Sequence, residues 1–241
     1  DLYHIQIDQV SANLRLKEML ENKEINFEQY TKNRLSIESI ANKSLFHVVD
    51  DYKRLHTNFT VLKKSIRTEF ITIENEEVEE LDVPNSQPTF LALLMKDEKS
   101  VNIDEYNRYK DLVYNGKFYD NFSEILNCSR SKCKKYFFTY LFGQNIKDYS
   151  GMEYAFRTEF PTISKWIADK KENNKYTVIA HELQSIESEW IFCKVVKSLK
   201  REIPDIKLFT VHDSIIYPKR YSVKVNEVFE SYMKQLIISN N

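Results

Sequence analysis

Helical spacing of apolar residues marks three stretches of the chain. Near the N-terminus, Leu14, Leu16 and Leu20 lie in a polar background, and a Leu35-x-Ile-x2-Ile-Ala run follows. This spacing predicts that residues 1–50 form two or three helices with polar outer faces. Further along, residues 180–189 have an amphipathic pattern that continues through Trp190, Ile191 and Val195. We expect a helix there as well.

Two other stretches have the character of strands that end at an aspartate. Leu208 to Val211 and Ile215 to Tyr217 are short apolar runs separated by His212-Asp213, which predicts a hairpin with a carboxylate at its tip. A Val/Leu-containing stretch ends at Asp82 and is followed by Pro84 and an apolar segment, Phe90 to Met95. A strand that ends at Asp82 and then turns into a helix is the natural interpretation.

The pattern between these aspartates is chemically more specific. Ser129 to Gln144 reads SRSKCKKYFFTYLFGQ, which places Arg130, Lys134, Phe138 and Phe142 four residues apart and ends with Gly143. On a helix each such step advances about 6 Å and rotates about 40°, so the four side chains form one slanting ridge.

A nucleoside triphosphate has the same order of parts as this ridge. The two cations can hold phosphates, and the two rings can lie against the sugar and base. A Lys/Arg-rich helix that only places a solvated face beside a core face has similar spacing. The spacing alone leaves both interpretations open.

Three motifs in order resemble one enzyme superfamily. Arg-x3-Lys-x3-Phe-x3-Phe-Gly resembles motif B, the fingers helix, of family A DNA polymerases and single-subunit phage RNA polymerases. Residues 80–96, with Asp82, resemble motif A, and residues 207–219, with His212-Asp213, resemble motif C. Taken singly, Asp82 and Asp213 could be ordinary turn aspartates. Their occurrence in the superfamily's order makes the resemblance specific.

The resemblance implies a two-metal-ion mechanism of phosphoryl transfer. Asp82 and Asp213 would be the catalytic carboxylates and would hold two Mg²⁺ ions, with Mn²⁺ as a possible substitute, and the Val83 carbonyl would help. Arg130, Lys134, Phe138 and Phe142 would bind the incoming nucleotide.

Weaker matches suggest contacts with nucleic acid. Arg54-Leu and Ile66-Arg67-x2-Phe resemble segments that precede motif A, and Gln184 lies where the superfamily has a Gln-containing palm helix. Arg54, Arg67, Gln184 and His212 would then contact primer or template, with Gln184 in the minor groove. Arg67 could equally be a salt-bridged surface residue, and Gln184 an ordinary polar residue of a helix face.

The chain also departs from the superfamily's pattern at positions that would lie near the sugar of the bound nucleotide. Five residues after Asp82, where DNA polymerases usually have Glu and the phage RNA polymerases a small residue, stands Gln87. Phe142 replaces the usual Tyr and has no hydroxyl. Both favour deoxynucleotides, whereas Ser214 after His212-Asp213 resembles the RNA polymerases. The preferred sugar stays open.

Length and net charge limit which domains such an enzyme can contain and how strongly it can bind a template. With 241 residues and a net charge of −1, we expect neither a full thumb nor an exonuclease domain, and weak template binding unless a processivity or thumb-supplying partner assists. Because the chain begins with Asp, we expect a processed or trimmed protein. The acidic run Glu74 to Glu80 is expected to be a solvated loop or a strand edge.

Cysteine and apolar content bear on location. Three cysteines without a metal-ligand pattern are typical of reduced thiols. The sequence has neither a signal peptide nor an apolar run that could span a bilayer. We therefore expect a cytoplasmic protein of a bacterial or phage-infected cell, with no membrane partner.

The sequence thus predicts an α+β protein with a polymerase right-hand palm, an antiparallel sheet backed by helices, and helical fingers. Residues 51–100 and 176–241 would form the palm and 101–175 the fingers, with 1–50 as a thumb remnant or adaptor. The expected activity is primer extension by a family A DNA polymerase on a DNA primer-template. A single-subunit RNA polymerase or primase, a non-templated terminal transferase, and a non-catalytic nucleic-acid-binding module of a replication or phage-defence assembly are the alternatives.

Overall fold

A computed structural model describes residues 1–144 and 150–238 of the chain. The chain divides into two compact units. The first holds residues 1–82 and 188–234, and the second holds the described residues from 83 to 187 together with 235–238. The strands lie in the first unit and the second is helical. The protein is therefore of mixed α+β class, as the sequence predicts.

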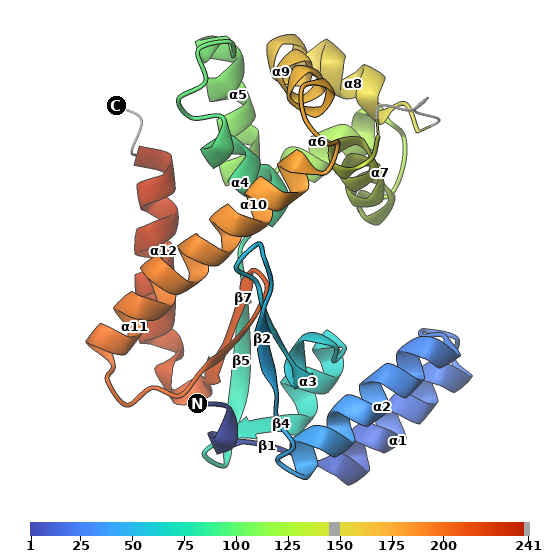
Figure 1. The fold of residues 1–241 in the computed structure, drawn as a ribbon, viewed down its shortest axis with the longest axis vertical. Helices are drawn as coiled ribbons and strands as arrows, with labels where there is room; N and C mark the ends of the chain where they lie inside the picture. The colour runs from blue at the N-terminus through green and yellow to red at the C-terminus, as the bar shows by residue number, and fades with distance from the viewer. Residues whose placement is uncertain (145–149, 239–241) are drawn as a thin grey trace. The chain divides into compact units, whose positions relative to one another are not determined.

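The first unit contains an antiparallel sheet of five described strands in the order β1-β4-β5-β7-β6 (Figure 1). The pairing of β5 with β7 places Asp82 opposite Ser214. A separate pair, β2 and β3, is also antiparallel. The strands are β1 Ile5–Ile7, β2 His47–Val49, β3 Leu55–Thr57, β4 Ile71–Ile73, β5 Glu76–Asp82, β6 Phe209–Val211 and β7 Ser214–Pro218.

Both strand predictions are confirmed. The hairpin β6–β7 turns at His212-Asp213, and β5 ends at Asp82 shortly before helix α4 begins at Ser86. His212 has a φ of +53°, which a tight two-residue hairpin turn requires at its first central position.

The N-terminal helices pack into the core of the first unit. Helix α1 begins after Asp8, whose carboxylate accepts a hydrogen bond from Ser11 N at 3.1 Å, and α2 begins with a capping box of Asn26 and Gln29. Leu16 of α1 is buried in the same cluster as residues of the sheet. Residues 1–50 are thus built into the sheet unit, in part through β1. The helices are α1 Gln9–Glu21, α2 Phe27–Ala41 and α3 Lys64–Phe70, with short turns η1 Leu2–His4 and η2 Asn58–Thr60.

The acidic run is not the strand edge that we expected. Only Glu74 and Asn75 form a turn, whereas residues 76–82 form β5, which lies between β4 and β7. An inner strand can carry carboxylates because other side chains partner them: Arg220 forms an ion pair with Glu76, and Arg67 Nη2 lies 2.8 Å from Glu80.

The second unit is held together by aromatic side chains. Phe118, Phe137 and Phe156 are fully buried, and the Phe118 and Phe137 ring centroids lie 4.8 Å apart in an edge-to-face contact. This cluster holds one face of α7 against α6 and α8. The helices are α4 Ser86–Leu94, α5 Ile103–Tyr114, α6 Phe118–Ile125, α7 Arg130–Phe142, α8 Met152–Glu159, α9 Pro161–Glu172 and α10 Val178–Glu189.

The observed units divide the chain at 82/83 and 187/188, whereas the sequence suggested 100/101 and 175/176. Helix α4 explains the first difference. The Tyr109 hydroxyl donates to Pro88 O at 3.0 Å and the Tyr106 hydroxyl to Ala92 O at 3.2 Å. These buried bonds join α4 to α5, so α4 belongs to the helical unit.

The expected helix through residues 180–195 is confirmed, and it continues into the first unit. Trp190 packs edge-on against Phe229 with centroids 5.4 Å apart. None of the described helices has the length and apolar character needed to cross a bilayer. The remaining elements are η3 Trp190–Val196, α11 Lys197–Glu202, η4 Lys219–Tyr221 and α12 Ser222–Ile238.

Candidate active site

The two predicted catalytic aspartates lie at the same end of the sheet. Asp82 is the last residue of β5 and faces Ser214, the first residue of β7. Asp213 immediately precedes Ser214 in the turn. Opposite residues of an antiparallel pair have Cα atoms roughly 4.5–5.5 Å apart, so Asp82 and Asp213 are close neighbours. Val83, the proposed carbonyl donor, follows Asp82 and is buried.

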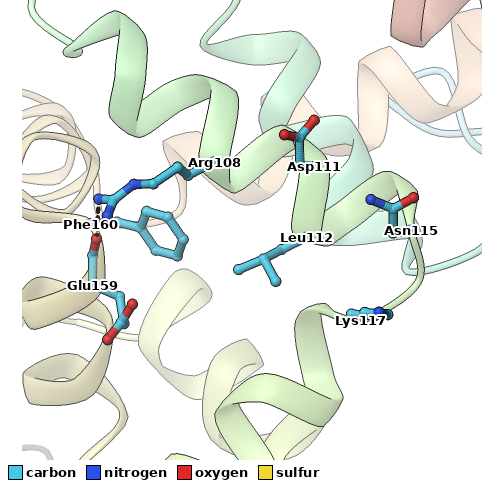
Figure 2. A pocket seen from close by; sticks show the side chains of 7 residues that line it. All are labelled: Arg108, Asp111, Leu112, Asn115, Lys117, Glu159 and Phe160. Carbon is cyan, nitrogen blue, oxygen red and sulfur yellow. Dashed lines mark hydrogen bonds between the residues drawn. The ribbon is translucent and has the colours of Figure 1, made fainter.

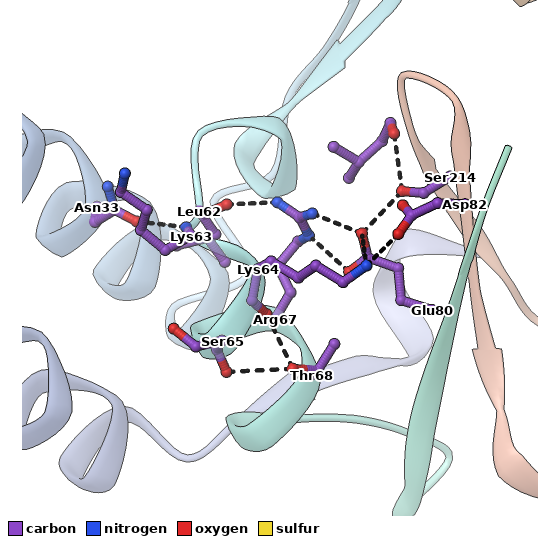
Figure 3. A network of polar contacts seen from close by, with 11 residues as sticks. Asn33, Leu62, Lys63, Lys64, Ser65, Arg67, Thr68, Glu80, Asp82 and Ser214 are labelled. Atoms are coloured by element: carbon purple, nitrogen blue, oxygen red, sulfur yellow. Dashed lines mark hydrogen bonds and ion pairs between the residues drawn. The ribbon is translucent and has the colours of Figure 1, made fainter. Parts of the chain in front are cut away.

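The Asp82 carboxylate forms an ion pair with Lys64 of α3 (Figure 3). Both groups are accessible: the Asp82 side chain is 45% exposed and that of Lys64 is 54% exposed. The Lys64 ammonium also lies 3.9 Å from Glu80 Oε1. Nothing in the sequence had singled out Lys64.

Behind this pair lies a buried network. The Glu80 side chain is 1% exposed, and its carboxylate accepts hydrogen bonds from Arg67 at 2.8 Å and 3.4 Å. Arg67 also donates to Leu62 O. The Ser214 hydroxyl lies 3.0 Å from Glu80 Oε1 and 2.9 Å from Val211 O. The network therefore connects α3, β5 and the hairpin that carries Asp213 (Figure 3).

Two residues that were singled out in the sequence, Arg67 and Ser214, have structural roles in this network. Arg67 forms an ion pair, but it is buried, whereas the salt-bridged alternative was a surface residue. Ser214 stabilises the hairpin from within. Glu80 was noticed in the sequence only as part of the acidic run, because a carboxylate in a charged run gives no sign that it will be buried.

His212 lies in a cationic part of the first unit. Its ring centroid is 6.3 Å from that of His56. Burial, with the nearby charges of Arg54, His56 and Arg67, lowers the pKa of His212 to about 4, although Asp50 opposes this shift. His212 is therefore neutral at pH 7. Arg54, proposed to bind nucleic acid, belongs to this same neighbourhood.

In the second unit, the predicted ridge is present on α7. The helix runs from Arg130 to Phe142, and the Ser129 hydroxyl caps it by accepting from Lys132 N at 3.4 Å. Cys133, Phe137 and Leu141 are its buried residues. On the ridge, the rings of Phe138 and Phe142 lie 5.6 Å apart, and Lys134 Nζ lies 5.5 Å from the Phe138 ring centroid.

Arg130 has partners within its own unit. Its Nε donates to Asp120 at 3.1 Å and its Nη2 donates to Asn85 at 3.2 Å. The guanidinium lies 5.5 Å from the Tyr119 ring centroid. The Asp120 pair is exposed on both sides, and such pairs are worth only about 0–1 kcal/mol. An anionic ligand could replace this partner at little cost.

The C-terminal end of α7 depends on a glycine and a buried lysine. A Cβ at Gly143 would lie 2.4 Å from Thr139 O, so a larger residue would force the chain away from the helix. Lys171 of α9 donates to Tyr140 O at 2.5 Å and Gly143 O at 3.0 Å. Burial lowers the pKa of Lys171 to about 8. Lys171 was not recognised in the sequence, because its partners lie on another helix.

Gln87 and Gln184 lie on different helices of the second unit. Gln87, in α4, is buried, and its amide donates to Glu187 of α10 at 3.0 Å. Glu187 is buried as well. Gln184 lies on α10 and is partly exposed. The Gln87 amide is therefore engaged by a buried carboxylate from α10.

The second unit also has an open hollow of about 330 Å³ (Figure 2). Arg108 borders it, donates to Glu159 O at 3.0 Å and lies 5.9 Å from the Phe160 ring centroid. None of the predicted site residues lines this hollow. Its lining residues are Arg108, Asp111, Leu112, Asn115, Lys117, Glu159 and Phe160.

The candidate metal ligands are few. Among residues 1–144 and 150–238 there is no group of three or more His, Cys, Asp or Glu side chains placed to hold one ion. Mg²⁺ is commonly bound by one or two carboxylates, with water and substrate phosphates completing its shell. Asp82, Asp213 and the Val83 carbonyl fit that requirement. The Lys64 ammonium on Asp82 shows that this carboxylate attracts a cation.

Comparison with solved structures finds a distant likeness to a polymerase domain. The POL domain of Pol1 from M. smegmatis, in complex with DNA primer-template and dNTP, matches with a TM-score of 0.44 and 11% sequence identity, over 93% of this chain and 53% of that chain. This chain thus spans about half the length of the chain it matches. No family model and no curated protein matches the sequence. A likeness at this level does not establish a family.

Proposed function

We propose that this protein is a template-directed nucleotidyltransferase, a DNA polymerase of the family A type that extends a primer 3′ end. The observation that carries the proposal is the pairing of β5 with β7, which brings Asp82 and Asp213 to the same end of an antiparallel sheet. Two carboxylates that come from distant parts of the sequence and meet at an exposed sheet end are what two-metal-ion phosphoryl transfer requires.

In this proposal the metal site lies where β5 ends. Asp82, Asp213 and the Val83 carbonyl hold Mg²⁺, for which Mn²⁺ can substitute. Bound divalent ions supply the positive charge that favours an ionised attacking oxygen and stabilises the departing pyrophosphate. The buried Arg67–Glu80 pair holds the strand behind Asp82. A neutral His212 adds no further charge beside Asp213, and with Arg54 it contacts the primer end.

The second unit provides the nucleotide-binding residues. Arg130 and Lys134 hold the triphosphate, with bidentate hydrogen bonds available from the Arg130 guanidinium. Phe138 packs on the base and sugar. Gln87 and Phe142 screen the sugar, and the absence of a hydroxyl on Phe142 favours deoxynucleotides. Gln184 contacts base edges without regard to sequence.

The proposal is tested by extension of a labelled DNA primer, alone and on a template, with dNTPs or NTPs and with Mg²⁺ or Mn²⁺. Asp213→Asn serves as the matched inactive variant. We expect templated growth with dNTPs that this variant lacks. Growth with NTPs would favour an RNA polymerase or primase, and growth without template a terminal transferase.

A non-catalytic nucleic-acid-binding module is the alternative of another class. It predicts that the wild-type protein binds a primer-template but does not extend it under any of these conditions. Filter binding or fluorescence anisotropy with the same labelled primer-template distinguishes the two. Binding without growth, also in the presence of candidate processivity proteins, would contradict the proposed activity.

A further inference from the structure

Lys64 occupies an unusual place for an exposed lysine. It is the first residue of α3, and its side chain crosses to the end of β5, where the ammonium contacts Asp82 and approaches Glu80 (Figure 3). The two carboxylates differ in their other partners. Glu80 is already held by Arg67 at 2.8 Å, so Lys64 pairs chiefly with Asp82.

The Lys64–Asp82 pair can be exchanged at little cost. Both side chains are about half exposed, and exposed ion pairs of this kind contribute little to stability. Lysine has a flexible stem and a compact charge, so its ammonium can leave without distorting the helix that carries it. The Arg67–Glu80 pair, in contrast, is buried and hydrogen-bonded, and it would stay in place.

We propose that Lys64 is a built-in counter-cation that competes with a divalent ion for the Asp82 carboxylate and thereby sets the apparent affinity of the metal site. This inference rests on the proposed function, because it takes Asp82 as a metal ligand. An ammonium and a divalent cation cannot contact the same carboxylate oxygens without repelling each other. Metal binding therefore requires Lys64 to give up Asp82.

The expected size of the effect follows from Coulomb's law. Two unit charges at 4 Å in a water-like medium interact by about 1 kcal/mol, and the energy is larger for a divalent ion or a partly buried site. Removal of the Lys64 charge should therefore tighten metal binding by roughly 5- to 10-fold. The effect should shrink at high ionic strength, because the site is exposed.

The experiment measures Mn²⁺ binding to the full chain by electron paramagnetic resonance, without nucleotide or DNA. Lys64→Met and Lys64→Gln remove the charge, and Lys64→Arg keeps it. Lys63→Met is the matched control, because Lys63 neighbours Lys64 but forms no ion pair with a described carboxylate. We expect both neutral variants to bind Mn²⁺ 5- to 10-fold more tightly, and Lys64→Arg and Lys63→Met to stay within about 2-fold of wild type.

Asp82→Asn separates the inference from the function on which it rests. If wild type binds Mn²⁺ and Asp82→Asn does not, the metal site is where we propose it. Unchanged or weaker binding by both folded Lys64 variants would then overturn the role of Lys64 alone. If Asp82→Asn binds Mn²⁺ as wild type does, or wild type does not bind it, the metal assignment fails and this inference fails with it.

Discussion

The sheet end with Asp82 and the helix α7 carry charges of opposite sign, and they support these charges in the same way. In both places the exposed group has a weak partner: Lys64 for Asp82, and Asp120 for Arg130. In both places a buried charge holds the backbone behind it: Arg67–Glu80 in the sheet, and Lys171 at the end of α7. Groups that can exchange partners are thus exposed, and groups that cannot are buried.

The largest expected effect is the loss of activity when either of the two proposed catalytic carboxylates is removed. Asp82→Asn and Asp213→Asn each remove a negative charge that the proposed metal site needs, so we expect primer extension to fall by about 10³-fold or more. The side chains keep their shape, and thermal unfolding should show that the fold is intact. Activity within about 10-fold of wild type in either variant would rule out the assignment.

The next prediction concerns stability. Arg67→Met leaves the Glu80 carboxylate buried without its main partner, so we expect the free energy of unfolding to fall by about 3–5 kcal/mol. Lys64→Met breaks the exposed pair on the same strand and should cost about 1 kcal/mol or less. Urea unfolding of the two variants measures the difference. Equal losses would show that exposure does not separate the two pairs.

The ridge on α7 allows a matched test of binding. Lys134 and Lys135 are adjacent and both exposed, but only Lys134 lies in line with Arg130, Phe138 and Phe142. Lys134→Met should weaken nucleoside triphosphate binding by about 10-fold, because it removes a charge that would contact phosphate. Lys135→Met should change it by less than about 2-fold. Equilibrium binding of a fluorescent dNTP measures both, and equal effects would favour a merely solvated helix face.

The last prediction concerns Lys171 and the pH dependence of stability. Burial lowers its pKa to about 8 from an ordinary value near 10.4, so the unfolded chain binds more protons between these two pH values. The contribution of Lys171 to stability therefore rises as pH rises from about 8 to about 10.5. We expect the free energy of unfolding to rise by about 1–2 kcal/mol over this pH range. The rise is limited because the charged form of Lys171 also gains from its carbonyl partners. The rise should be smaller in Lys171→Met, measured by urea unfolding across this pH range, and an unchanged pH profile in that variant would contradict the prediction.

Short-range patterns account for the parts of the protein that the sequence predicted. The ridge on α7, the hairpin at His212-Asp213 and the strand, turn and helix around Asp82 each depend on residues within one short stretch. Helical and extended periodicity, glycine and turn residues are local properties. The inner place of β5 in the sheet was not predicted, because its run of glutamates looks like a solvated edge until the partners from α3 and η4 are known.

The sequence by itself therefore determined which residues could carry chemistry and on which kind of element each would lie. Tertiary structure decided which of them meet: Asp82 with the Asp213 turn through the β5–β7 register, Lys64 with Asp82, Arg67 with Glu80, and Lys171 with the end of α7. It also decided that Glu80 is buried and Asp82 exposed, although they lie two residues apart on one strand. The physical reason is that ion pairs and burial depend on distances between segments that are remote in sequence, whereas periodicity depends only on neighbours along the chain.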